Sequence, residues 1–120
     1  MYGVPVDLDL GQFHGAMLER IDLGIYIVHF RFAAEPTAII SVEGDWQLIG
    51  PDGRILDQQE EPSEREAFRI HVLLGRQVVA SEVSAPEWFS LTFDSGHHLR
   101  VYDRSVQYES FSIQPGDIYI

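Results

Sequence analysis

Apolar and polar residues alternate along several short segments in the first half of the chain. Every second side chain of the segment Ile25–Phe32 is apolar or aromatic, which predicts a strand with one buried face made of Tyr26, Val28, Phe30 and Phe32. Thr37–Val42 follows after a connection short enough to predict a hairpin. Trp46–Ile49 is the next predicted strand. It ends at Gly50–Gly53, whose Pro-Asp-Gly order favours a tight turn.

The second half of the chain has the same kind of pattern. Gln77–Val83 and Trp88–Phe93 are predicted strands, and Phe89, Leu91 and Phe93 share one face of the latter. Asp94–His97 predicts a hairpin turn whose glycine takes the left-handed conformation. Leu99–Tyr102 and Tyr108–Ile113 are predicted to continue the sheet.

The order of these elements indicates one β-motif present twice, in halves at about 15–56 and 75–120. Each half has a glycine, a strand, an aromatic strand, a returning strand, a second aromatic strand and a turn. Aligning the halves pairs Gly15 with Gly75, Phe30 with Phe93, and Trp46–Ile49 with Phe111–Gln114. Duplication of a short unit explains this order, although any two β-meanders share part of it. Because neither unit buries its own face, we expect one domain over 1–120, either an antiparallel β-sandwich or a partly open barrel.

A polar, acidic connector at 57–74 separates the two halves. Ser63 and Glu66 have the spacing of a helix capping box, and Gly75 is a natural helix stop. These signals predict one connecting helix, which makes the fold mainly β, or α+β with a single helix. At the end of the connector, apolar residues also alternate with period two, at Ile70, Val72 and Leu74. This alternation favours a strand there instead of a helix.

The composition is that of a single acidic domain. A chain of 120 residues suits one core. Its net charge of −11 repels nucleic-acid phosphates and anionic membranes, so we expect neither as a partner. No apolar run is long enough to span a bilayer, and the first residues lack the basic start and apolar stretch of a secretion signal. We therefore expect a cytoplasmic protein.

Few residue types remain that catalyse reactions or bind metals. The chain has no cysteine and no lysine, which removes thiolate chemistry, disulfides and lysine Schiff bases. It also lacks the common hydrolase, phosphate-loop, dinucleotide and zinc-protease motifs. A metal would need Asp94, His97 and Asp103 to converge, and a small hydrolase or isomerase would need Asp94, His97 and Glu109. A solvated hairpin turn explains these residues as well, so we predict no catalytic residue, no metal and no cofactor.

Aromatic residues beside acidic ones are the remaining candidates for a binding surface. Trp46 and Phe111 occupy matching places in the two halves and are expected in the core. Trp88 begins a strand, which favours core packing and exposure about equally. The predicted binding surface therefore comprises Trp88, Tyr102, Tyr108 and Glu109.

The second half also has a recognisable motif. Leu91–Val101 has an apolar-Thr-Phe-x-x-Gly hairpin, and a Tyr-Glu-aromatic strand follows at Tyr108–Ile113. With the preceding segment Leu73–Val78, this pattern resembles small bacterial proteins grouped as a domain of unknown function. The resemblance covers most of the second half and more faintly the first, and it carries no catalytic residue over. Acidic bacterial proteins of this size also look similar to immunity partners of secreted toxins.

The sequence thus predicts a non-enzymatic protein-binding domain, of the immunity type, whose acidic surface meets a basic toxin. A second hypothesis is a small-ligand-binding barrel, with a cavity lined by Tyr26, Phe30, Trp88 and Phe93. The apolar last strand, Ile118–Ile120, would be an exposed edge if unpaired, and such an edge allows two copies to form a homodimer.

Overall fold

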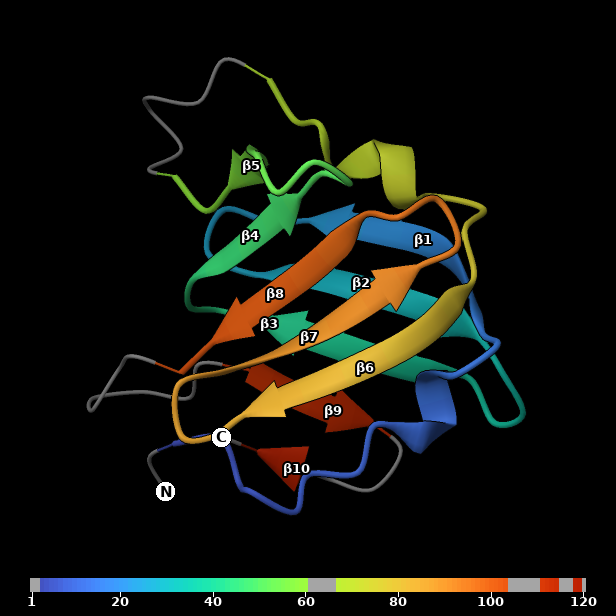
Figure 1. The fold of residues 1–120 in the computed structure, drawn as a ribbon, viewed down its shortest axis with the longest axis vertical. Coiled ribbons are helices and arrows are strands. Elements are labelled where there is room, and N and C mark those ends of the chain that lie inside the picture. Colours follow the sequence, from blue (N-terminus) through green and yellow to red (C-terminus); the bar gives the residue numbers. More distant parts are fainter. Residues whose placement is uncertain (1–2, 61–66, 104–110, 115–117, 120) are drawn as a thin grey trace.

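The protein folds into two antiparallel β-sheets packed face to face (Figure 1). The computed structural model describes residues 3–60, 67–103, 111–114 and 118–119. In sheet 1 the strand order is β1 (Met17–Leu23), β2 (Val28–Ala33), β3 (Ala38–Val42), β9 (Phe111–Gln114) and the two-residue β10 (Ile118–Tyr119). In sheet 2 it is β5 (Ile55–Gln58), β4 (Trp46–Ile49), β8 (His98–Tyr102), β7 (Trp88–Phe93) and β6 (Val78–Ser84). The fold is mainly β and sandwich-like, and its sheets do not form a closed barrel.

Each sheet combines strands from both halves of the chain. Sheet 1 consists of the meander β1-β2-β3 from the first half and the pair β9-β10 from the second. Sheet 2 consists of the meander β6-β7-β8 and the hairpin β4-β5 from the first half. Where the halves meet, β3 pairs with β9 in sheet 1 and β4 pairs with β8 in sheet 2. These pairings place Ile40 opposite Ile113 and Leu48 opposite Leu99, and all four side chains are fully buried. Because each half completes the other half's sheet, neither meander is a complete layer on its own.

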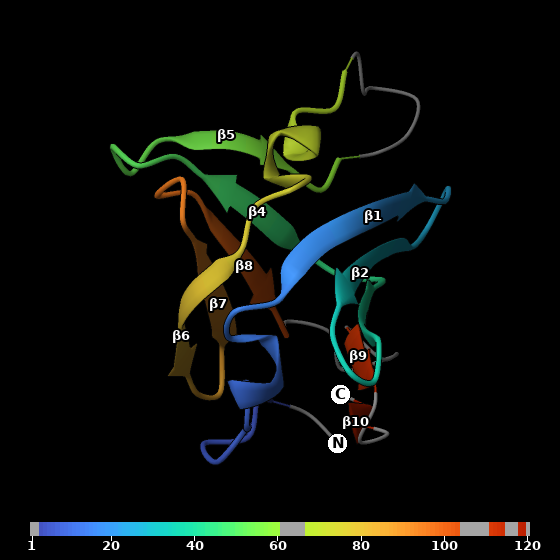
Figure 2. The same ribbon diagram turned by 90° about the vertical axis from the view of Figure 1, so that its right-hand side faces the viewer.

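The two sheets are joined where β1 and β6 begin, as Figure 2 shows near the middle of the view. The amide of Gly15 donates to the carbonyl of Val78 (2.7 Å), and the amide of Gly75 donates to the carbonyl of Leu18 (2.8 Å). Met17 and Gln77 form an antiparallel bridge between these contacts. The two hydrogen bonds are equivalent, because Gly15 and Gly75 occupy matching places, as do Leu18 and Val78. The structural halves are therefore related by an approximate two-fold arrangement. That they arose by duplication stays a prediction.

The aromatic residues of the repeat align differently from the sequence-based prediction. Phe32 lies opposite Leu18 on β1, and Phe93 lies opposite Val78 on β6. Leu18 and Val78 make equivalent contacts at the sheet junction, so Phe32, not Phe30, is the structural counterpart of Phe93. The alignment failed here because consecutive inward positions of a strand are both aromatic, and a shift of two residues preserves the buried face.

Aromatic rings fill the space between the sheets. Phe32 packs edge-on against Phe13 with ring centroids 5.1 Å apart, and stacks on Phe93 at 6.5 Å. Phe89 of sheet 2 packs edge-on against Phe111 of sheet 1 at 4.9 Å. Trp46 and Phe111, the first residues of β4 and β9, are buried as predicted. These contacts bury apolar surface from both halves in one core, which is the main source of stability for a small sandwich.

The predicted connecting helix is wrong for the part of 57–74 that the structure describes. Asp57 belongs to β5, and the only helical residues in the described part of this segment form the 3-10 helix η3 (Ile70–Leu73). Ile70 and Leu73 are buried, as expected for a 3-10 helix in which residues three apart share a face. The capping-box pair Ser63 and Glu66 lies outside the described residues.

Residues three apart are sufficient to bury one apolar face, so the apolar spacing did not require a longer α-helix. The same arrangement occurs before β1, where η1 (Gly11–Phe13) follows the buried Leu10 and buries Phe13. Among the residues that can be described, no helix is long and apolar enough to cross a membrane.

Gly75 is expected to be sensitive to substitution although its surroundings are open. It has a φ of +83°, and an added Cβ would meet nothing within 4 Å. Gly75→Ala is therefore expected to lower the free energy of unfolding by about 1–2 kcal/mol through backbone strain alone. Gly75→Asn should lose less, because asparagine tolerates the left-handed region. Urea unfolding of both variants tests this, and equal losses would contradict the conformational explanation.

Candidate binding sites

The outer face of sheet 2 carries a row of polar side chains. The neighbours of Arg100 along β8 are buried in the core, so the side chain of Arg100 points outward. Arg100 lies opposite Ser90 on β7 and opposite Gln47 on β4. Ser90 in turn lies opposite Glu82 on the edge strand β6. The row therefore crosses four neighbouring strands, with a cationic group near its centre and an acidic group at its β6 end.

A groove of about 340 Å³ lies over Arg100, Ser90 and Glu82 of this row. Its lining includes Ser90, Thr92, His98 and Arg100, and the turn between β4 and β5 forms part of its wall. That turn approaches the β7–β8 turn closely, since a Cβ added to Gly96 would lie 3.2 Å from the ring carbons of Pro51. A concave site of this size with a few converging polar groups is of the kind that holds small ligands.

The guanidinium of Arg100 is held by packing and not by an acceptor. Its central carbon lies 3.9 Å from the ring centroid of Trp88, a cation–π geometry. Its Nε is buried and has no hydrogen-bond partner, and it is alone in this respect among the side-chain nitrogen and oxygen atoms of the described residues. A buried charged donor without an acceptor is uncommon, because its lost hydration is not replaced.

The structure brings together two of the four residues that the sequence marked as a binding surface. Trp88 and Tyr102 lie opposite each other on the outer face of sheet 2. Trp88 is half-buried and supports Arg100, whereas Tyr102 is only 7% exposed and its hydroxyl donates to Oε1 of Gln47 at 2.8 Å. Both rings therefore contact the polar row, Trp88 at Arg100 and Tyr102 at Gln47. Tyr108 and Glu109 lie outside the described residues.

Sequence reasoning missed Arg100, Ser90, Thr92 and His98. The hydroxyl of Thr92 and Nδ1 of His98, opposite each other on β7 and β8, are 2.8 Å apart. The available signal was alternation, because these residues are the polar positions between apolar ones on both strands. Alternation places these side chains on the outer face. Their contacts with one another also depend on the register between β7 and β8, which alternation does not predict.

The proposed metal cluster does not assemble, whereas the catalytic set of Asp94, His97 and Glu109 stays untested because Glu109 lies outside the described residues. His97 lies in the β7–β8 turn, with Nδ1 2.8 Å from the hydroxyl of Ser95. Asp103 lies at the opposite end of β8, where its amide donates to the carbonyl of Glu87. Asp94, His97 and Asp103 therefore do not converge, and the described histidine and acidic residues form no group of three that fits a metal ion.

The four aromatic residues proposed to line a barrel cavity lie in three different environments. Phe30 and Phe93 are buried between the sheets. Trp88 is on the outer face of sheet 2, and Tyr26 is 81% exposed. Tyr26 was expected to face inward, but β2 begins only at Val28. These four residues do not share a cavity.

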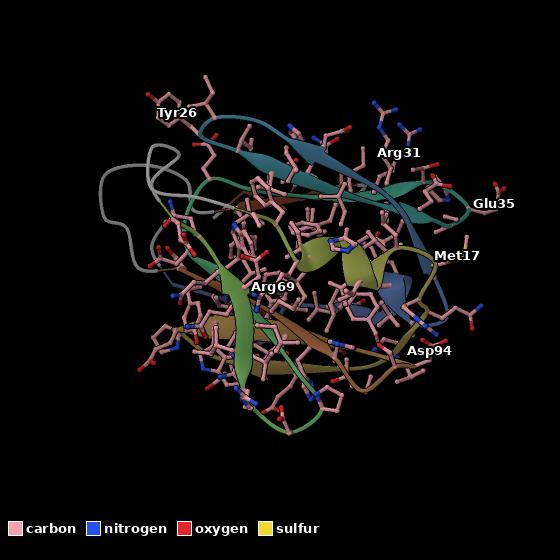
Figure 3. The ribbon with its side chains drawn as sticks, turned by 90° about the horizontal axis from the view of Figure 1, so that it is seen from above. Met17, Tyr26, Arg31, Glu35, Arg69 and Asp94 are labelled. Carbon is pink, nitrogen blue, oxygen red and sulfur yellow. The ribbon has the colours of Figure 1, made fainter. Side chains whose placement is uncertain are left out.

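A second candidate surface is the turn between β1 and β2, called here the tip and comprising Leu23, Ile25 and Tyr26. These side chains are 49%, 71% and 81% exposed, and Figure 3 shows Tyr26 projecting away from the packed interior. The turn is tight, because the amide of Gly24 donates to the carbonyl of Ile27 at 2.8 Å. Three large apolar side chains at one exposed turn are typical of a protein-interaction site.

Acidic residues lie at the same end of sheet 1 as the tip. Leu23, Val28 and Val42 are opposite one another on successive strands, so the β3–β4 turn lies beside the β1–β2 turn. That neighbouring turn carries Glu43 and Asp45, of which Glu43 is exposed. The tip is therefore an apolar centre with an acidic neighbour on one side.

No family model, no curated protein and no solved structure matches this chain.

Proposed function

We propose that this protein is a non-catalytic binding domain whose partner is a basic protein, as in an immunity protein that neutralises a basic toxin. The observation that carries the proposal is the tip, where Leu23, Ile25 and Tyr26 expose apolar surface to solvent. Large apolar side chains at interfaces contribute most when they enter a pocket of the partner and lose all contact with water. Tyrosine suits this role because its ring is large and rigid.

The charge of the protein supports a basic partner. A net charge of −11 attracts basic surfaces over distances of about 10 Å at moderate salt and speeds encounter with them. The acidic β3–β4 turn, with Glu43 exposed, lies beside the apolar tip. We therefore expect a partner surface with an apolar pocket bordered by arginine or lysine.

The tip can be tested by changing its apolar side chains without touching the core. Wild-type protein and the double variant Ile25→Ser, Tyr26→Ser are immobilised and exposed to a lysate of the protein's own cells at about 50 mM salt. We expect one basic protein to bind the wild type, and the double variant to bind it at least about 30-fold more weakly, as for a residue at an interface centre.

A matched control is Val79→Ser, which removes an apolar side chain that is 57% exposed on β6, in the other sheet. This variant should retain full binding, and raising the salt should release the partner from both proteins. Equal binding by the tip variant would assign the interaction to another surface. Recovery of no basic protein by the wild type would contradict the proposed function itself.

A further inference from the structure

We propose that the groove on the outer face of sheet 2 is a binding site for a carboxylate group of a small ligand, with Arg100 as its principal contact. This site lies on the opposite sheet from the tip and does not depend on the proposed protein partner. Three observations support it: an unpartnered buried donor, a guanidinium fixed in place, and a groove that contains it.

The buried Nε of Arg100 lacks a hydrogen-bond acceptor among the described residues. A guanidinium presents five N–H donors in a rigid fork that matches a carboxylate with two parallel hydrogen bonds. Within the described part of the chain Arg100 has no ion pair, and its Nε is buried without an acceptor. The nearest acidic residue along the polar row, Glu82, is two strands away, beyond Ser90. An external carboxylate would satisfy the fork that no described residue satisfies.

Trp88 holds the guanidinium fork of Arg100 in place. Stacking on Trp88 restricts the guanidinium before a ligand arrives, so less side-chain freedom is lost on binding. Tyr102 fixes Gln47 on the other side through a hydrogen bond of 2.8 Å, and Gln47 lies opposite Arg100. The groove also carries the hydroxyl of Ser90, which can donate to a second ligand oxygen.

The acidic charge around the groove favours a ligand with a single negative charge. Glu82 lines the groove, and the whole protein carries a net charge of −11. Both repel an anion, and the total repulsion is about twice as large for a dianion as for a singly charged carboxylate, since the Coulomb energy is proportional to the charge of the ligand. The groove therefore favours a singly charged carboxylate over a phosphate dianion.

Nuclear magnetic resonance on the ¹⁵N-labelled full chain tests the proposal directly. Acetate and methyl phosphate are titrated separately at constant ionic strength and about pH 7.5, where a phosphate monoester is mostly a dianion. We expect a saturable change in the Nε–H resonance of Arg100 with acetate, together with changes at the amides of Ser90 and Thr92. Methyl phosphate should bind more weakly, and tighter binding of methyl phosphate would overturn the preference for a carboxylate.

Three variants separate the fork from general charge effects. Arg100→Gln should weaken acetate binding by about ten- to a hundredfold, and Arg100→Lys should restore only part of it, because lysine keeps the charge without the fork. Arg76→Gln is the matched control, since Arg76 is exposed, does not line the groove, and its loss changes the net charge equally.

Two results would overturn the assignment. One is an Arg100→Gln variant that binds acetate as the wild type does. The other is a wild-type titration without saturation, in which shifts are spread over the whole surface. The wild-type titration needs no substitution, so it decides the question even if a variant does not fold.

Discussion

Replacing Phe32 with alanine is expected to lower the free energy of unfolding by about 3–5 kcal/mol, the usual range for removing a buried phenylalanine. The effect should be large because Phe32 is fully buried and its ring contacts two others, Phe13 at 5.1 Å and Phe93 at 6.5 Å. Phe93 belongs to the opposite sheet, so the surrounding strands cannot close the cavity without moving the sheets. Urea unfolding, monitored by circular dichroism, measures the change.

Tyr26→Ala is the matched control for this prediction. It also removes an aromatic ring from the region of β2, but this ring is 81% exposed, so stability should change by no more than about 0.5 kcal/mol. A double-mutant cycle of Phe32→Ala with Phe93→Ala should show a coupling of about 0.5–1.5 kcal/mol for the stacked pair. Additive losses would mean that the two rings do not interact across the sheets.

Local sequence patterns predicted the strands well where one face is apolar and the ends carry turn residues. Trp46–Ile49 and Trp88–Phe93 are strands over the predicted residues. The turn glycine Gly96 has a φ of +87°, as predicted, and Gly53 at the end of the Pro-Asp-Gly turn has a φ of +85°. Alternation failed at the start of β2, because Ile25 and Tyr26 continue the apolar pattern while Gly24 turns the chain. β5 was also missed, since Ile55–Gln58 is short and half polar.

The arrangement of the strands depends on contacts that local patterns do not encode. The hairpin β4-β5 joins sheet 2, and β9-β10 joins sheet 1, through pairings between residues about 50 to 75 positions apart. The polar row of the groove has the same origin. Arg100 and Glu82 are both visible as polar strand residues, but only the registers of three strands place them on one line. The sequence therefore predicted the elements of the site without predicting the site.

The tip and the groove differ in how the residues around them are held. The tip is a tight turn whose apolar side chains contact solvent, so a partner can bury them without unfolding any strand. The groove is built on central strands, where Arg100 and Ser90 are fixed by pairing on both sides. Rigid strands position small-ligand contacts more accurately than loops do. This difference is consistent with a protein partner at the tip and a small ligand in the groove.

Asp57→Ala is expected to lower the free energy of unfolding by about 2–4 kcal/mol, although Asp57 lies on a short edge strand. Its Oδ2 accepts hydrogen bonds from the amides of Arg69 (2.6 Å) and Ile70 (3.1 Å), and its Oδ1 accepts one from the amide of Gln58 (2.9 Å). The carboxylate thus fastens the start of η3 to β5. Alanine would leave these amides without that acceptor in a region where Asp57 is only 7% exposed.

Asp52→Ala is the control, because the Asp52 carboxylate also accepts a backbone hydrogen bond, from Arg54 at 3.1 Å, but in an exposed turn where water replaces it. Its loss should cost no more than about 0.5 kcal/mol. Asp57→Asn should fall between the two, since the amide side chain keeps one of the two acceptor oxygens. Hydrogen exchange gives a local test, because the Ile70 amide should lose protection in Asp57→Ala before the central strands do. If Asp57→Ala is as stable as Asp52→Ala, these amides find other acceptors, and the position of η3 is then determined by the burial of Ile70 and Leu73 alone.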